Sequence, residues 1–305
     1  MNGRQVLLLA GYATRHSVRG GIGLVFLLLS LTFGLIVAHT MLQSVEAIAR
    51  QMQQHTGGDE REVFERLSRE ARPVVAWMVA PRMASGATPD PETERKTDAW
   101  AKYLLEERPG ILSAIFLILL FGWPLVVSFG AFDLYAGDIG SRQLRYQLLR
   151  ADRSSIFFGR LLGTVLTFVA VLLALGAVVV VYMGCRLSVY SWSSLLLWGA
   201  YGTIALIWLS LPYIALCAWI SAACSSSFLS LTLVSLVIGG VPLLGLALRA
   251  THEVGGYLAY VLPWPYQTRL LHHDPLQVAI AAGACLLQAA LFTWLAHRTF
   301  LRRDL

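Results

Sequence analysis

The residues best suited to metal binding or acid–base chemistry form one short run, His272-His273-Asp274. Imidazole and carboxylate groups are common metal ligands, so this run has the chemistry of a cation site. Adjacent histidines nevertheless make a poor chelate on a helix, because successive side chains point in different directions. His39 lies near the end of an apolar run, which is typical of an interfacial rather than a catalytic residue. The sequence therefore favours no metal site.

The lysines exclude a nucleotide-binding P-loop. Such a loop needs a glycine directly before its lysine and a serine or threonine directly after it. The lysines of this chain are Lys96, which follows Arg95, and Lys102, which follows Ala101. No Ser-His-Asp set and no pair of acidic residues recurs within the apolar runs. We therefore expect no catalytic residue, no cofactor and no ATP-hydrolysing site in the chain itself.

The cysteines predict packing rather than redox chemistry. They lie in or beside apolar runs and form no CxxC pair: Cys185, Cys217, Cys224 and Cys285. Free cysteine in such a setting behaves as a small hydrophobic residue. We expect these side chains to be buried, without a structural disulfide.

The composition is that of a membrane protein. Of the 305 residues, 56% are hydrophobic and 14% are charged, and the mean hydropathy is +0.62. Soluble domains carry about a quarter charged residues, so disorder is excluded and an ordinary water-soluble enzyme is disfavoured. The net charge of +6 does not indicate nucleic-acid binding, because no soluble basic domain carries it.

Crossing ~30 Å of hydrocarbon takes about 20 helical residues, and six apolar runs are long enough. The predicted transmembrane helices cover residues 20–42, 110–132, 161–185, 193–220, 228–249 and 275–297. The stretch 187–248 holds 62 residues without Asp, Glu, Lys or Arg, and its serine-rich run 221–227 predicts a turn between two helices. The predicted fold class is an all-α polytopic membrane protein.

Charge placement predicts the orientation of these spans. Residues 1–19 form an amphipathic stretch, expected to lie as a helix in the membrane interface. Arginine and lysine accumulate in short cytoplasmic loops. With the N-terminus inside, eleven arginines lie inside and three outside, once the long segment 43–109 is left out. Both termini, including the tail 298–305, are therefore predicted to be cytoplasmic, and the loop 250–274 extracytoplasmic.

Residues 43–109 predict a helical insertion outside the membrane. Its predicted helices are Gln43–His55, Glu60–Arg72 and Pro91–Glu107. Gly57-Gly58 is expected to end the first helix, Asp59 to cap the second and Pro73 to end it. Apolar residues at i,i+4 spacing give each helix one apolar stripe. The insertion is either a packed spacer or a docking surface for an extracytoplasmic protein.

The arginines of residues 133–160 must lie outside the hydrocarbon, because each would cost about 2.5–3.5 kcal/mol at the bilayer centre. Ser141 is expected to cap a short amphipathic helix from Arg142 to Arg150, and Asp152 or Ser154 to cap the helix that leads into span three. The charges alone fit either a solvated loop that sets topology or a docking element.

Three runs of this segment follow one another at characteristic spacing: Asp138-Ile139-Gly140-Ser141-Arg142, Leu148-Leu149-Arg150-Ala151-Asp152-Arg153-Ser154 and Gly159-Arg160. In order and spacing these runs resemble the permease subunits of ABC-2-type ATP-binding-cassette transporters. Here Asp138 stands for the family's glutamate, Ser141 for threonine and Arg160 for lysine, and Asp152 occupies the place of a Pro-Val-Ser turn. The interfacial helix, the six spans and the run 262–266 before span six fit the same family. The insertion is similar to permeases of the multicopper-enzyme or nitrous oxide reductase maturation type.

The resemblance implies that the short helix after span two is a coupling helix, docked on a separate cytoplasmic ATPase that binds ATP and Mg²⁺. The implied coupling residues are Asp138, Gly140, Ser141, Arg142, Arg145, Leu148, Leu149 and Arg153. It further implies a bacterial inner-membrane complex of two ATPase copies with two permeases, identical or related, that exports a substrate. Some of the arginines can instead bind anionic membrane lipids.

Helix-breaking residues inside the apolar runs are candidate hinges: Pro124, Pro212, Gly239, Gly240 and Pro242. Tolerated packing irregularity is the alternative interpretation. Two other functions stay open at this point. The chain can relay ATPase motion to an extracytoplasmic partner on residues 43–109 without moving a substrate. It can also be a membrane enzyme acting on lipids, for which only the histidine pair offers polar groups.

Overall fold

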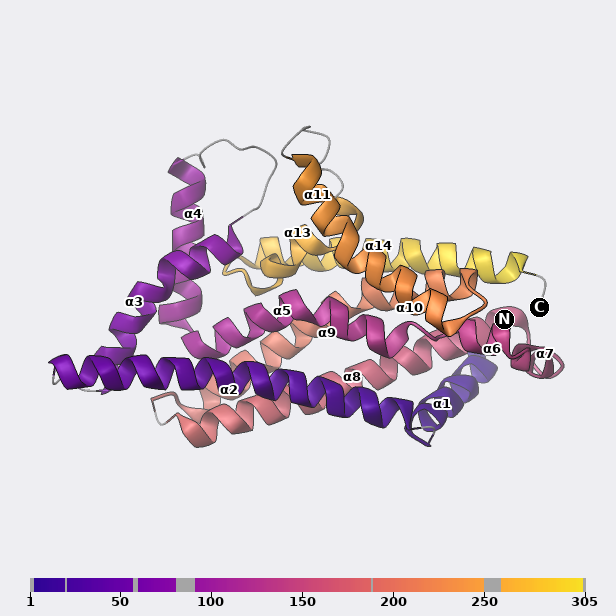
Figure 1. Ribbon diagram of the computed structural model, residues 1–305, viewed down its shortest axis with the longest axis horizontal. Coiled ribbons are helices and arrows are strands. Elements are labelled where there is room, and N and C mark those ends of the chain that lie inside the picture. The colour runs from indigo at the N-terminus through magenta and orange to yellow at the C-terminus, as the bar shows by residue number, and fades with distance from the viewer. Residues whose placement is uncertain are drawn as a thin grey trace.

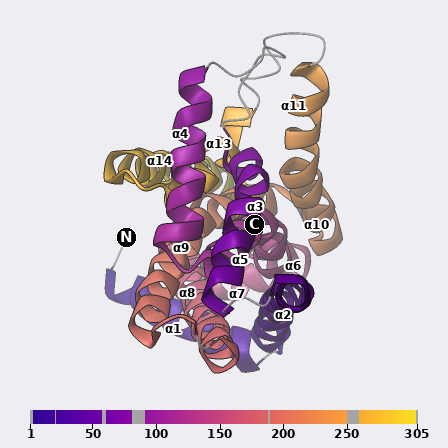
Figure 2. The ribbon, with the colours of Figure 1, turned by 90° about the vertical axis from the view of Figure 1, so that its left-hand side faces the viewer.

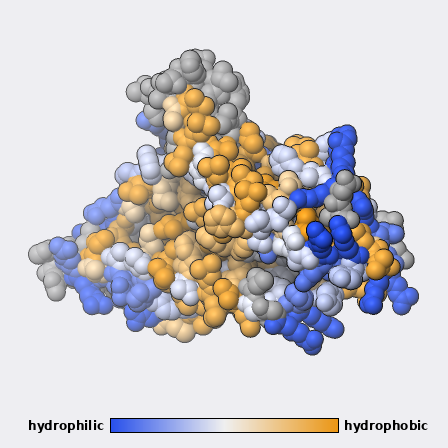
Figure 3. All heavy atoms as spheres, turned by 45° about the vertical axis from the view of Figure 1, so that its right-hand side comes forward, coloured by the Kyte–Doolittle hydropathy of each residue, from blue (hydrophilic) through white to orange (hydrophobic). Residues whose placement is uncertain are grey.

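The computed structural model describes residues 3–19, 21–56, 60–80, 91–187, 189–249 and 259–303, and these form helices and short connections without a strand (Figure 1). Six helical segments are long and apolar enough to cross a membrane: Gly23–Ile48, Gly110–Gly140, Arg153–Arg186, Trp192–Ala223, Ser227–Gly245 and Pro275–Arg302. The surface in Figure 3 is apolar across its middle and hydrophilic toward both ends. The expected all-helical fold, with six helices long and apolar enough to cross a membrane, is confirmed for the described residues.

The spans run between two ends of the molecule (Figure 1). One end carries α1 (Gly3–Arg19), α6 (Ala136–Gly140) and α7 (Gln143–Leu148), and we call it the termini end because both chain ends lie there. The other end carries α3 (Glu60–Val79) and α4 (Pro91–Lys102), and we call it the cap end. Viewed from the cap end, α4 rises beside the bundle (Figure 2).

The long helices are α2 (Ile22–Thr56), α5 (Gly110–Ala131), α8 (Arg153–Arg186), α9 (Trp192–Ala223) and α14 (Pro275–Arg302). The central one is α9, which packs against α5, α8 and α14. The most apolar stretch is 72% buried in α5 and 67% in α9, but only 22% in α2 and 17% in α14. α2 and α14 therefore form the periphery of this chain.

Close helix contacts depend on small residues, as is common where lipid replaces water. A Cβ at Gly163 of α8 would lie 2.8 Å from the carbonyl oxygen of Ala10 in α1. A Cβ at Gly176 would clash with the hydroxyl of Thr203 in α9. These glycines let α8 approach both the interfacial helix and the central span.

The two most buried spans are joined by a hydrogen bond next to their prolines. Trp123 Nε1 donates to Ser210 Oγ over 2.7 Å. Pro124 and Pro212 adjoin this bond, and each lies inside an unbroken α-helix. Neither proline therefore interrupts its span in this structure.

Span five is built differently from the others. It consists of α10 (Ser227–Ser235), the π-helical turn η2 (Leu236–Gly240) and α11 (Val241–Arg249). Gly239 and Gly240 lie in the π turn and Pro242 follows it, so the missing N–H of the proline falls where the helix already departs from α geometry. Beyond this turn α11 rises away from the remaining spans (Figure 1). Of the candidate hinges, only these three lie at a change of helix type.

The turn before span five is shorter than expected. α9 continues through Ala223 and α10 begins at Ser227, so Cys224, Ser225 and Ser226 alone connect them. The first half of the serine-rich run therefore belongs to α9.

The insertion forms helices as expected, but the predicted end of its second helix at Pro73 is wrong. α2 extends without a break to Thr56, and α4 continues through the π turn η1 (Tyr103–Glu107). Pro73 does not end α3, which runs on to Val79. Burial of Val75 and Val79 in the core offsets the backbone hydrogen bond that Pro73 removes. Gly57, Gly58 and Asp59 lie outside the described residues.

The described part of the connection between span five and span six, residues 259–274, contains the short helical turns η3 (Ala259–Val261), α13 (Trp264–Gln267) and η4 (Thr268–Leu271). They fold back against α14 rather than extending away from it. The Trp264 ring meets Phe121 of α5 edge-on at 6.1 Å. Phe121 lies about 16 Å along α5 from Gly110, at 1.5 Å per residue, so this segment re-enters the apolar bundle.

Candidate functional site

The segment predicted to couple to an ATPase folds as two short helices. Ser141 ends α6 instead of capping the following helix, and its side chain makes no capping hydrogen bond. Arg142 takes the N-cap position of α7 with φ of 60°, in the left-handed region. The expected helix from Arg142 to Arg150 is thus shorter, Gln143–Leu148. The chain turns sharply at Ser141-Arg142 because α6 is fixed against the bundle before α7 begins.

Hydroxyl and carboxylate groups of three spans fix α6. Ser221 Oγ accepts hydrogen bonds from the backbone N–H groups of Tyr135, at 2.9 Å, and Ala136, at 3.0 Å. Asp133 Oδ1 accepts from Ser227 Oγ and from the N–H of Gly137, both at 2.7 Å. Span two therefore connects to the end of span four and to the start of span five.

Gly140 lies where α6 approaches the turn between α9 and α10. A Cβ at this position would lie 2.5 Å from the carbonyl oxygen of Ser225. Only glycine allows this approach without displacement of the backbone. Gly140 is therefore a packing residue of the segment.

Asp138 and Arg160, two charged residues of the family-like pattern, form an ion pair with each other. Their side chains are 24% and 20% exposed. The Arg160 guanidinium also donates to the carbonyl oxygen of Leu134 over 3.2 Å and to Gln147 Oε1 over 3.4 Å. Arg160 therefore ties α6, α7 and α8 together, and Asp138 is directed inward.

Arg153 is likewise used within the chain. It donates to the carbonyl oxygens of Leu301, over 3.2 Å, and Arg303, over 3.0 Å, at the end of α14. Arg303 donates in turn to the carbonyl oxygens of Ala222, at 2.7 Å, and Cys224, at 2.8 Å. These bonds satisfy carbonyl groups left free at helix ends. Asp152 occupies the N-cap of α8, as expected, but its side chain makes no capping hydrogen bond.

The remaining arginines of the segment are exposed. Arg142, Arg145 and Arg150 make no side-chain hydrogen bond or ion pair with any described residue. Tyr146 is 75% exposed and Leu149 is 84% exposed on the same short segment. We call these five residues, 142, 145, 146, 149 and 150, the basic knob.

The opposite side of α7 is firmly packed. Leu144 is buried in a cluster separate from the main core, together with Tyr135, Phe157 and Phe300. Leu148 packs at the edge of the same cluster. Tyr135 stacks on Phe157 at 5.2 Å and donates to its carbonyl oxygen over 2.9 Å. The basic knob therefore projects from a rigid junction of α6, α8 and α14.

At the cap end, the histidine run has a structural setting. His272 Nδ1 accepts the backbone N–H of Asp274 over 2.9 Å, and Asp274 Oδ1 caps α14 by accepting the N–H of Leu276. Trp100 of α4 packs against the His272 ring at 4.5 Å and donates its indole N–H to the carbonyl oxygen of Leu271 over 3.2 Å. Burial, followed by the neighbouring His273, lowers the pKa of His272 to about 4. Its ring is therefore neutral near pH 7.

Metal and thiol chemistry gain no support within the described ranges. Among these residues, no group of three or more His, Cys, Asp or Glu side chains is arranged to hold a metal ion. The cysteines are free thiols, and Cys217, Cys224 and Cys285 are buried as expected. Cys185, the next-to-last residue of α8, is exposed. The prediction of burial was wrong for this residue.

Sequence patterns missed the residues that hold the segment in place. Asp133, Ser221 and Arg303 act through contacts across 79 or more positions of the chain, which no local pattern displays. A comparison with known protein families finds no family that matches the chain, and no characterised protein matches it significantly.

Proposed function

We propose that this chain is the membrane subunit of an ATP-driven transporter, and that a separate ATPase docks on the basic knob. The observation that carries the proposal is the contrast within one segment: Asp138, Arg153 and Arg160 are bound internally, while Arg142, Arg145 and Arg150 face outward. A protruding helix with unpaired guanidinium groups and the exposed apolar Leu149 fits a groove lined by acidic and apolar residues. The termini end is then cytoplasmic.

The packing supports a mechanical role for this contact. A rigid element can transmit a rigid-body movement to the helices on which it is fixed. The junction below α7 combines the Tyr135 cluster, the Ser221 hydrogen bonds and the Asp138–Arg160 ion pair. A push on the basic knob would thus move the ends of α8, α9 and α14 together. In the complex, ATP and Mg²⁺ belong to two ATPase copies, and a second permease, identical or related, completes the membrane part that exports the substrate.

Co-purification tests this proposal. The tagged protein is isolated in mild detergent, and its soluble partners are identified and quantified. We expect a stoichiometric ATPase with the unaltered chain and its loss with Arg142→Glu/Arg145→Glu. The matched control is Arg298→Glu/Arg302→Glu, which makes the same charge change on exposed residues of α14. Absence of an ATPase under several gentle conditions, or equal loss with the control, would contradict the proposal.

A second function, relay of ATPase motion to an extracytoplasmic protein, is favoured by one observation. α3 exposes an apolar pair at i,i+3 spacing, with Val74 61% exposed and Trp77 67% exposed. Exposed apolar surface on a cap is typical of a contact site for a protein or a membrane interface. In this alternative the cap itself would move during the ATPase cycle.

Distance measurements separate the two functions. Spin labels at Glu70→Cys on α3 and Leu276→Cys on α14, with Cys185→Ser to remove the exposed native thiol, report the position of the cap against span six. The complex is measured without nucleotide and in an ATP-trapped state. A changed distance distribution supports the relay, whereas an unchanged one leaves the cap as a fixed cover and favours export.

A further inference from the structure

A cavity of about 560 Å³ lies at the cap end, enclosed by segments that are far apart in sequence. Its walls come from the end of α3, from α4, from α5, from α11 and from residues 260–277. Small-molecule sites commonly have volumes of about 300–1,000 Å³ and form where several elements meet. The size and position of this cavity are thus those of a ligand site rather than of a packing defect.

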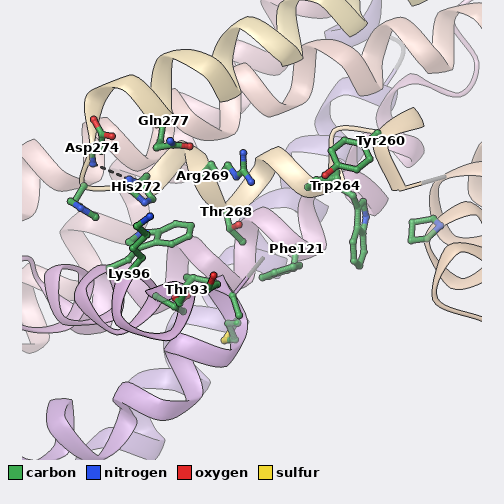
Figure 4. A pocket seen from close by; sticks show the side chains of 18 of the residues that line it. Thr93, Lys96, Phe121, Tyr260, Trp264, Thr268, Arg269, His272, Asp274 and Gln277 are labelled. Carbon is green, nitrogen blue, oxygen red and sulfur yellow. Dashed lines mark hydrogen bonds between the residues drawn. The ribbon is translucent and has the colours of Figure 1, made fainter. Parts of the chain in front are cut away.

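The cavity is polar at one side and aromatic at the other (Figure 4). Lys96 of α4 lies with His272 and Asp274 on the polar side. Phe121 and Trp264 lie on the aromatic side. Because Phe121 is about 16 Å along α5 from Gly110, the aromatic side reaches the level of the spans. A ligand that fills both sides must be amphiphilic.

The positive charge on the polar side of the cavity favours a ligand whose polar head group is negatively charged. Arg269 lines the cavity and is partly buried, and it forms no ion pair with a described carboxylate. Within the described ranges, the Arg269 guanidinium contacts the Tyr266 ring, at 6.0 Å from its centre. A half-buried guanidinium that has no counter-ion among the described residues is costly, and an entering carboxylate or phosphate would offset that cost.

The other polar groups agree with an anionic head. His272 is neutral near pH 7 because burial lowers its pKa to about 4, and its Nδ1 is occupied, so its Nε2–H remains as a donor. The Thr268 hydroxyl lies beside Arg269 in the same wall. Among the described lining residues Asp274 is the one acidic side chain, and it caps α14. Lys96 adds a second cation, although it also pairs with Glu92 at 2.6 Å.

We propose that this cavity binds a single membrane amphiphile with an anionic phosphate or carboxylate head, held by Arg269, and an acyl chain that lies against Phe121 and Trp264. A lipid is the occupant because the aromatic side of the cavity continues into the spans, where acyl chains are the available apolar groups. This inference does not rest on the ATPase partner. It concerns the chain alone and is tested with the chain alone.

Photo-crosslinking in lipid nanodiscs tests the proposal. The full chain is placed in phosphatidylcholine discs that contain a trace of phosphatidylglycerol with a diazirine in its acyl chain, or the matching phosphatidylcholine probe. Labelled peptides are identified by mass spectrometry. We expect labels on peptides containing Phe121, Pro242 or Trp264, with the anionic probe preferred about tenfold, the effect of one charge-assisted hydrogen bond.

Three variants make the test specific. Arg269→Gln should reduce labelling by the anionic probe to the level of the neutral probe, and Arg269→Lys should restore most of the preference. Arg95→Gln removes one exposed positive charge from α4 outside the cavity and should change nothing. Circular dichroism confirms that each variant keeps its helices. Unlabelled cavity peptides, or equal labelling by both probes that is insensitive to Arg269→Gln, would overturn the proposal.

A soluble competitor separates a lipid from a free anion. Glycerol phosphate carries the head chemistry without the acyl chain. If a lipid is the occupant, unlabelled phosphatidylglycerol competes with the probe and glycerol phosphate does not. Displacement by millimolar glycerol phosphate would overturn the assignment to a membrane amphiphile.

Discussion

The two ends of the bundle use similar residues for opposite purposes. The segment around α7 carries Arg142, Arg145 and Arg150, and α3 at the cap end carries Arg61, Arg66, Arg69 and Arg72. At the termini end, Asp138 and Arg160 neutralise each other inside the segment, and the arginines of the basic knob are exposed and form no ion pair with a described residue. At the cap end, Arg72 is paired with Glu106 and, at 3.7 Å, with Asp98.

The difference shows how charge placement indicates function in this chain. Paired charges join α3 to α4 and hold the cap over a cavity. Unpaired charges on a rigid base offer a surface to something outside the chain. Exposed ion pairs contribute little stability. Arginines without an ion-pair partner therefore indicate a binding surface better than the number of arginines does. The predictions below test this contrast, from the largest expected effect to the smallest.

Trp100→Ala should release the cap. The substitution removes a buried ring that packs on His272, together with the 3.2 Å hydrogen bond to Leu271. We expect the free energy of opening of α4 to fall by about 3 kcal/mol. Trp100→Phe, which keeps a ring but loses the hydrogen bond, should cost about 1 kcal/mol. Hydrogen exchange of residues 91–107 measures both changes in opening free energy. Equal protection in the unaltered chain and in the two variants would contradict the prediction.

Arg160→Gln should destabilise the termini end, whereas Arg145→Gln should not. Arg160 loses an ion pair and two further hydrogen bonds. Because the pair is partly exposed, we expect about 2 kcal/mol, less than for a fully buried pair. The exposed Arg145 should change stability by less than about 0.5 kcal/mol. Unfolding by sodium dodecyl sulfate in mixed micelles measures the two values, and similar losses would contradict the division into paired and unpaired arginines.

Gly140→Ala tests the close approach of α6 to the α9–α10 turn. The added Cβ would lie 2.5 Å from the Ser225 carbonyl oxygen, so the backbone must shift, at a cost of about 1–2 kcal/mol. Gly283→Ala is the matched control, because no atom lies within 4 Å of its Cβ position in α14. That control should stabilise the helix by about 0.5–1 kcal/mol. The same unfolding assay applies, and a neutral Gly140→Ala would show that α6 is loosely held.

Acidification should loosen the cap. The folded-state pKa of His272 is lowered to about 4 from an ordinary 6.5, so the neutral ring is favoured in the fold. The unfolded segment then binds more protons between these values, and stability falls as pH decreases from 6.5 toward 4. Hydrogen exchange of α4 at pH 7.5 and 5 should show weaker protection at pH 5. His272→Gln should abolish that difference and His273→Gln should preserve it.

The positions of the helices could be predicted from the sequence, but the tertiary contacts that hold them together could not. Apolar runs of sufficient length identify each span, because hydrocarbon thickness sets helix length. The prediction that Pro73 ends its helix was wrong, because burial of Val75 and Val79 outweighs the one backbone hydrogen bond that the proline removes. The prediction that Ser141 caps the following helix was also wrong. Hydrogen bonds to Ser221 and Asp133 fix α6, and Arg142 takes the N-cap position of α7 instead. Tertiary contacts decided both outcomes.

The candidate site, too, was predictable in its position along the chain but not in its tertiary contacts. The sequence predicted the segment 133–160 as the candidate site and assigned Asp138 and Arg153 to coupling together with Arg142 and Arg145. Which of them face outward depends on partners that are distant in sequence, such as Leu301 for Arg153. The cavity at the cap end left no local signal, because its lining residues come from five separate regions.

Hydrogen exchange of the full chain with and without its co-purified ATPase tests the central claim most directly. The account predicts that ATPase binding increases the protection of residues 142–150 and leaves residues 60–80 and 91–107 unchanged. Protection of the cap segments, with residues 142–150 unaffected, would contradict it.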